Sequence, residues 1–181
     1  MHSPYHQGPP PLGRLRHMRY TEFYPLRPES VAHARQDFRA AVTRSALFDS
    51  VAEAAELCLS ELASNAVRHA DDRRPRRWFH VSCLVQGMRR RALRLVVHDV
   101  DSTHLPVMPP HPVDPLSALD EEAESGRGLL LIAGMATACG VEHGEGVNGK
   151  NVWCTFDLPE PTVRELTDPR VDWAATAAPC R

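Results

Sequence analysis

A carboxylate and a carboxamide lie one helical turn apart within residues 57–70, LCLSELASNAVRHA. On a helix, Glu61 and Asn65 share a polar stripe, whereas Leu59 and Leu62 fall on the opposite, apolar arc. A carboxylate can act as a general base, and an amide oxygen can bind Mg²⁺. Such a pair is also common on ordinary solvated helix faces, so by itself it leaves both interpretations open.

Three more polar residues follow the same stripe, namely Ser64, Arg68 and His69. Ser64 and Arg68 are candidate contacts for a phosphate group. His69 lies near the expected end of the helix, where a histidine is favourable with the helix dipole without any catalytic role.

The helix that carries these residues is expected at residues 51–70. Asp49 or Ser50 can cap its N-terminus, and Pro75 within a run of charges ends the pattern. Residues 51–59 are apolar nearly all round, which predicts that this half is buried and that the polar stripe opens at Glu61.

The rest of the chain alternates strand and helix patterns around this helix. Periodicity and turn signals predict strands at residues 19–26, 78–85 and 92–99, a first helix from Pro28 to about residue 47, a third helix at residues 126–140 with Gly140 as its C′ residue, and a terminal antiparallel pair at residues 141–149 and 150–158. Residues 100–125 contain five prolines and no usable period, so we expect a long loop there.

Length and composition point to one domain. The 181 residues are enough for a proper core at residues 18–158, with a flexible extension at residues 1–17 and a tail at residues 159–181.

The net charge of −2 gives no global attraction to nucleic acid or to an anionic membrane. We expect a cytoplasmic protein, because the sequence has neither a run of about 18 apolar residues nor a signal-peptide centre. The five cysteines are odd in number and widely spaced, which fits reduced core thiols better than a zinc site.

Two further groups complete the candidate chemistry. Asp99 ends an expected strand, and Gly126 and Gly128 begin the third helix, where such a glycine pair by itself more often serves packing or capping. In order and spacing, ELASNAVRHA, GRGLLLI and GKNVWCTF resemble the ATPase family of gyrase, heat-shock chaperones, histidine kinases and mismatch-repair proteins, over most of the chain. Within that family the chain is most similar to the stand-alone anti-sigma-factor serine kinases typical of actinobacteria.

The resemblance implies a Bergerat fold, which is an α/β two-layer sandwich whose mixed, mostly antiparallel sheet is covered on one face by about three helices. It implies ATP and Mg²⁺ as cofactors and a lid over the nucleotide at residues 100–125. It makes Glu61 the general base, Asn65 the Mg²⁺ ligand and Asp99 the acceptor for the adenine amino group. The other implied nucleotide-binding residues are Gly126, Arg127, Gly128, Leu129 and Asn151, with Arg68 and Lys150 as candidate phosphate contacts.

The chain departs from the family pattern in three places. Asp101 and Thr103 replace two glycines beside the adenine, Asn151 stands where threonine is usual, and prolines replace a second glycine run in the lid. These departures favour a degraded site, whereas the retained pair of Glu61 and Asn65 favours a working one.

The leading interpretation is an ATP-binding regulator that resembles an anti-sigma-factor serine kinase. It would bind Mg-ATP, phosphorylate a serine of an antagonist protein and so control a sigma factor. The alternative is a catalytically degraded nucleotide-binding or partner-docking module without kinase activity. A detached histidine-kinase catalytic domain and a slow ATPase are weaker alternatives. The expected partners are the sigma factor, its anti-anti-sigma antagonist and a second copy of the chain in a homodimer, without direct contact to nucleic acid or membrane.

Overall fold

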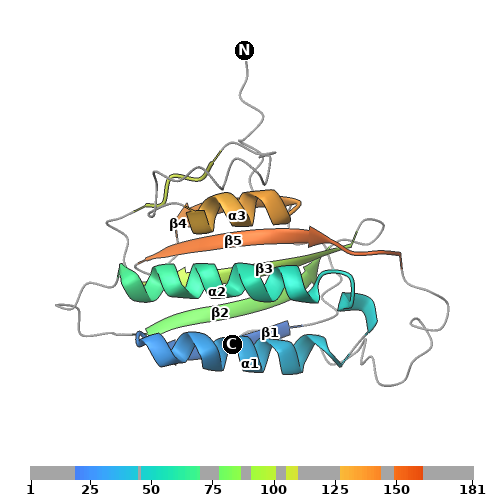
Figure 1. Cartoon of the computed structure of the whole chain (residues 1–181), viewed down its shortest axis with the longest axis horizontal. Helices are drawn as coiled ribbons and strands as arrows, with labels where there is room; N and C mark the ends of the chain where they lie inside the picture. The colour runs from blue at the N-terminus through green and yellow to red at the C-terminus, as the bar shows by residue number, and fades with distance from the viewer. Residues whose placement is uncertain are drawn as a thin grey trace, which may run out of the picture.

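The computed structural model describes residues 19–44, 46–69, 78–86, 91–100, 105–109, 127–143 and 149–160. Within these ranges, five strands form one antiparallel sheet in the order β1-β2-β3-β5-β4. Figure 1 shows helices α1, α2 and α3 covering one face of this sheet, with α2 packed between the other two. This arrangement is the predicted α/β two-layer sandwich. The strands are β1 (Arg19–Pro25), β2 (Trp78–Gln86), β3 (Ala92–Asp99), β4 (Ala138–His143) and β5 (Lys150–Asp157), and the helices are α1 (Pro28–Val42), α2 (Ala52–Arg68) and α3 (Arg127–Met135), with a short 3-10 turn η1 (Ala46–Phe48).

The central helix α2 buries one face because its small and apolar residues recur at helical spacing. Its buried residues are Ala55, Cys58, Leu59, Leu62, Ala63 and Ala66. The predicted cap at Asp49 or Ser50 is wrong, since Val51 is the N-cap residue and makes no side-chain capping bond. Instead, the Val51 N–H donates to the carbonyl of Phe48 at 2.9 Å, and both side chains are buried. The helix therefore begins at a backbone hydrogen bond between two buried apolar residues, without a side-chain cap.

Strict alternation along β2 and β5 separates the two faces of the sheet. In β2, Phe79, Val81, Cys83 and Val85 are buried, while the residues between them are half-buried. Period-2 alternation turns these four side chains to one face, where they join the core beneath the helices. Fully burying an apolar side chain of this size contributes about 1.5–3 kcal/mol, so this face holds the layers together.

The boundary between α3 and β4 differs from the prediction. The apolar run at residues 126–140 is expected to be one helix, yet α3 ends at Met135 and β4 begins at Ala138. Residues 138–143 pair with β5 instead, with Cys139 opposite Cys154 and Gly140 opposite Trp153. The antiparallel pair with β5 is confirmed, but it starts earlier than the predicted residue 141.

The four cysteines in the described ranges are Cys58, Cys83, Cys139 and Cys154, and all are free thiols. Burial raises the pKa of the Cys139 thiol to about 11 and that of Cys83 well above its usual value. These groups therefore stay protonated at neutral pH, as expected of reduced core thiols. No helix in the part of the chain that the structure describes is both long and apolar enough to cross a membrane.

Candidate functional site

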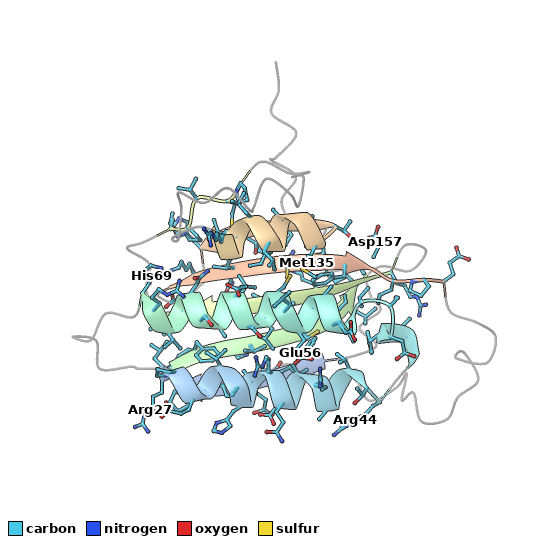
Figure 2. The ribbon with its side chains drawn as sticks, viewed as in Figure 1. Arg27, Arg44, Glu56, His69, Met135 and Asp157 are labelled. Atoms are coloured by element: carbon cyan, nitrogen blue, oxygen red, sulfur yellow. The ribbon has the colours of Figure 1, made fainter. Side chains whose placement is uncertain are left out.

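A cavity of about 380 Å³ opens beside the C-terminal half of α2. Its size falls within the range of small-molecule pockets, roughly 300–1,000 Å³, and mostly apolar walls with a few polar groups are typical of such pockets. Figures 1 and 2 show that the end of α2, marked by His69, and the start of α3 lie on the same side of the molecule. The lining residues are Leu62, Asn65, Ala66, Arg68 and His69 from the end of α2, Val97, Asp99, Lys150 and Val152 from β3 and β5, Leu129 from α3, and Leu105, Pro106 and Val107.

Asp99 and Lys150 form a buried ion pair in this cavity. The two residues are register partners on adjacent strands, and the distance from Lys150 Nζ to Asp99 Oδ2 is 2.8 Å. Their side chains are only 4% and 6% exposed. Burying charges away from water is costly unless they are paired. The attraction between Asp99 and Lys150 therefore offsets part of the cost of burying both charges in the cavity wall.

The turn before β5 fits closely against the end of β3. Gly149 has φ +137°, and a Cβ there would collide with the Asp99 carbonyl oxygen and crowd the His98 ring. Only glycine adopts this backbone conformation easily. Gly149 therefore lets β5 begin directly beside Asp99, which places Lys150 at the cavity.

Glu61 lies at the other predicted part of the site, against α3. A Cβ on Gly128 would overlap Glu61 Oε2, so this carboxylate occupies the space next to the first turn of α3. The structure thus brings together the predicted general base and one glycine of the predicted phosphate-holding turn. Arg127 is exposed and Leu129 lines the cavity, whereas Gly126 lies outside the described residues.

The polar stripe of α2 divides between two surfaces. Asn65 lines the cavity, but Ser64 lines a shallow groove between α1 and α2, together with Val31 and Val67. Arg68 borders both surfaces. Of the two phosphate candidates on this helix, only Arg68 therefore reaches the cavity.

The alternation of β5 separates Asn151 from the cavity. Lys150 and Val152 line the cavity, and Asn151 between them bonds through Oδ1 to His98 Nδ1 at 2.8 Å. His98 alternates in the same way with Val97 and Asp99, so this bond lies on the opposite face of the sheet. The predicted nucleotide contact at Asn151 is not placed at the cavity. Lys150 is placed there beside Asp99, the predicted adenine acceptor.

Several cavity residues are not singled out by the sequence analysis because they are apolar. Leu105, Pro106 and Val107 belong to the predicted lid at residues 100–125, and they line the cavity. Residues 101–104, with Asp101 and Thr103, and residues 110–126 lie outside the described ranges. The recurrence of Val152, Cys154 and Phe156 at period 2 was the signal that could have put Lys150 on the same face.

The donor set of the cavity fits a magnesium nucleotide. Among the described residues, no three histidine, cysteine, aspartate or glutamate side chains gather as a metal site. Mg²⁺ bound to a nucleotide needs few protein ligands, since phosphate oxygens and waters fill most positions. One amide oxygen from Asn65 is compatible with that requirement.

Comparison with protein families gives an independent result. The model of the histidine kinase-like ATPase domain matches residues 24–156. No individual curated protein matches the chain. The family match extends from β1 to β5 and includes every candidate site residue, and it supports an ATP-binding, regulatory function. The chain therefore belongs to the family of histidine kinase-like ATPase domains.

Proposed function

We propose that the protein is a cytoplasmic, ATP-dependent serine kinase that regulates a sigma factor. It binds Mg-ATP in the cavity between α2 and α3 and phosphorylates a serine of an antagonist protein. Modification of the antagonist then decides whether the sigma factor is held or released. The observation that supports this most directly is the contact between the Glu61 carboxylate and Gly128 at the start of α3.

The chemistry of this step follows from the side chains present. Glu61 accepts the proton of the serine hydroxyl, directly or through one water, while the serine oxygen bonds to the γ-phosphorus and ADP leaves. Gly128, without a Cβ, leaves the backbone at the helix start open to phosphate oxygens. Asn65 supplies an oxygen ligand for Mg²⁺, which neutralises phosphate charge when it is bound. Most of the rate enhancement would come from positioning these groups.

A second candidate is a module that binds nucleotide or docks partners without transferring phosphate. Two features favour it, namely the pairing of Asp99 with Lys150 and the replacement of two glycines by Asp101 and Thr103. Binding of Mg-ATP without any phosphate transfer would identify this alternative.

The two candidates are separated by phosphate transfer to co-expressed antagonist proteins, followed as phosphoserine by mass spectrometry. The decisive variant is Glu61→Gln, which keeps the shape of the side chain but removes its basicity. General-base catalysis contributes about 100- to 10,000-fold, so the transfer rate should fall by at least roughly 100-fold while Mg-ATP still binds.

Glu56→Gln is the matched control on the same helix. Figure 2 shows Glu56 on the side of α2 that faces α1. Its carboxylate accepts a hydrogen bond from Arg39 Nε at 2.8 Å. This control should transfer phosphate like the unmodified protein. A Glu61→Gln variant that transfers phosphate at the normal rate would remove Glu61 from the mechanism.

A further inference from the structure

Lys150 lines the cavity although its side chain is almost completely buried. Its side chain is 6% exposed, and its cavity neighbours on the strands, Val97 and Val152, are apolar. A solvated phosphate contact would need its ammonium group in solvent. The ammonium group instead is buried and lies 2.8 Å from Asp99 Oδ2.

The position of this ammonium group is fixed by the backbone. Asp99 and Lys150 are register partners, and Gly149 packs against the Asp99 carbonyl oxygen with φ +137°. Groups that are held in place before a ligand arrives lose little conformational freedom on binding. The pair therefore presents a preformed charged edge to whatever enters this end of the cavity.

The hydrogen-bonding capacity of the pair defines its ligand. An ionised carboxylate only accepts, at about four lone-pair sites, and an ammonium group only donates, through three N–H bonds. A ligand that faces both groups must offer a donor directly beside an acceptor. The Watson–Crick edge of adenine does so, with its 6-amino group next to N1.

We propose that Lys150 determines base specificity by donating a hydrogen bond to N1 of adenine while Asp99 accepts one from the 6-amino group. The inference rests on the proposed binding of ATP but not on kinase activity. A 6-oxopurine such as guanine also places an acceptor beside a donor, and the family match is what selects adenine. Lys150 is thereby a base-reading residue and not a phosphate contact.

The test compares the dissociation constants of ATP, 1-deaza-ATP and GTP for the full chain by calorimetry. In 1-deaza-ATP a C–H replaces N1, so the base no longer offers an acceptor to the Lys150 ammonium group. A hydrogen bond to a charged group contributes about 1.5–3 kcal/mol, which predicts roughly 10- to 100-fold weaker binding of 1-deaza-ATP than of ATP. Equal binding of the two would overturn the inference, and tighter binding of GTP than of ATP would overturn the choice of adenine.

Variants assign this discrimination to Lys150. The pair variant Asp99→Asn with Lys150→Met removes both charges together, so no unpaired charge stays buried, and it should bind ATP and 1-deaza-ATP within about threefold of each other. Arg39→Met removes a cation on α1 that does not line the cavity and should keep the discrimination of the unmodified protein. Discrimination that persists in the pair variant would contradict the role of Lys150. Failure of the unmodified protein to bind any of the three nucleotides would instead overturn the proposed function, and this inference with it.

Discussion

The carboxylate of Glu61 occupies the space beside Gly128 in which any other residue would place its Cβ. Glu61 lies in the middle of α2 and Gly128 in the first turn of α3, so the two helices meet where a base and a phosphate-binding turn are needed. The absence of a side chain at Gly128 therefore leaves room for the carboxylate of Glu61 in this position.

Replacing Gly128 by alanine should lower the rate of phosphate transfer with little change in thermal stability. The three atoms nearest to the added methyl group all belong to the flexible Glu61 side chain, and only the carboxylate oxygen would overlap it. The thermal midpoint should therefore change by no more than a few degrees. The displaced carboxylate would misplace the base, and displacements of about 1 Å can reduce catalysis roughly 100-fold. Thermal unfolding and phosphate transfer, measured on the same preparation, check this prediction.

Gly134→Ala, later in α3, is the matched control for helix propensity. It should gain up to about 1 kcal/mol of helix stability and transfer phosphate normally. Normal transfer by Gly128→Ala would show that the position of Glu61 next to Gly128 is unimportant.

Gly149→Ala should destabilise the protein itself. Its φ of +137° is unfavourable for alanine, and the new Cβ would collide with the backbone carbonyl of Asp99, which cannot move away easily. Strained backbone of this kind costs about 1–3 kcal/mol, so urea unfolding should shift to a lower midpoint by a corresponding amount. An unchanged midpoint would mean that the turn before β5 adapts freely.

Removing one member of the buried ion pair should be more harmful than removing both. Lys150→Met leaves Asp99 as an uncompensated buried charge, and loss of one partner in such pairs costs about 3–5 kcal/mol. The variant with both Asp99→Asn and Lys150→Met should recover most of that loss. Urea denaturation of the three proteins measures the difference, and equal stabilities of the single and the paired variants would contradict the prediction.

Much of the framework could be predicted from the sequence, because its local signals agree with its tertiary role. The α2 helix has one apolar arc, and β2 alternates strictly, so both elements lie close to their predicted bounds. The third helix was predicted too long because an apolar run such as residues 126–140 has no period that separates helix from strand. Pairing with β5, a tertiary contact, converts residues 138–143 into a strand.

The candidate site was predictable in its residue types but not in its orientations. Asn65 and Asp99 line the cavity, as their positions on α2 and β3 suggested. Asn151 and Lys150 were assigned from the motif alone, and a shift of one residue along a strand changes the face. The ion pair depends on strand register across 51 positions of sequence, which no local pattern contains.

The buried Tyr24 and the half-buried Tyr20 should make the protein sensitive to alkaline pH. Burial, opposed in part by the hydrogen bond with Tyr24, raises the pKa of Tyr20 to about 12. Burial first, and then hydrogen bonds with Tyr20 and Asp37, raise the pKa of Tyr24 well above its usual value. The unfolded-state pKa is about 10, so this stabilisation is complete below pH 10 and is lost as the pH rises from there through about 12.

Urea midpoints between about pH 8.5 and 11.5, for the unmodified protein and for Tyr24→Phe, check this alkaline transition. The unmodified protein should lose stability more steeply with pH than the variant. Only the unmodified protein has the Tyr24 hydroxyl, which ionises near pH 10 in the unfolded state and stays protonated in the folded state. Titrating groups that the two proteins share cancel in the comparison. Parallel profiles would contradict the assignment to these tyrosines.

The central claim is that the cavity beside Asn65 binds Mg-ATP, and the thermal unfolding midpoint tests it most directly. At a hundredfold excess over its dissociation constant, a ligand of the folded state stabilises by about 2.7 kcal/mol, which corresponds to a rise of roughly 5–10 °C for a domain of this size. We predict such a rise with ATP and Mg²⁺, a smaller one with ATP alone, and none of the magnesium-dependent part in Asn65→Ala. An unchanged midpoint of the unmodified protein at millimolar Mg-ATP, or an equal magnesium-dependent rise in the variant, would contradict the claim.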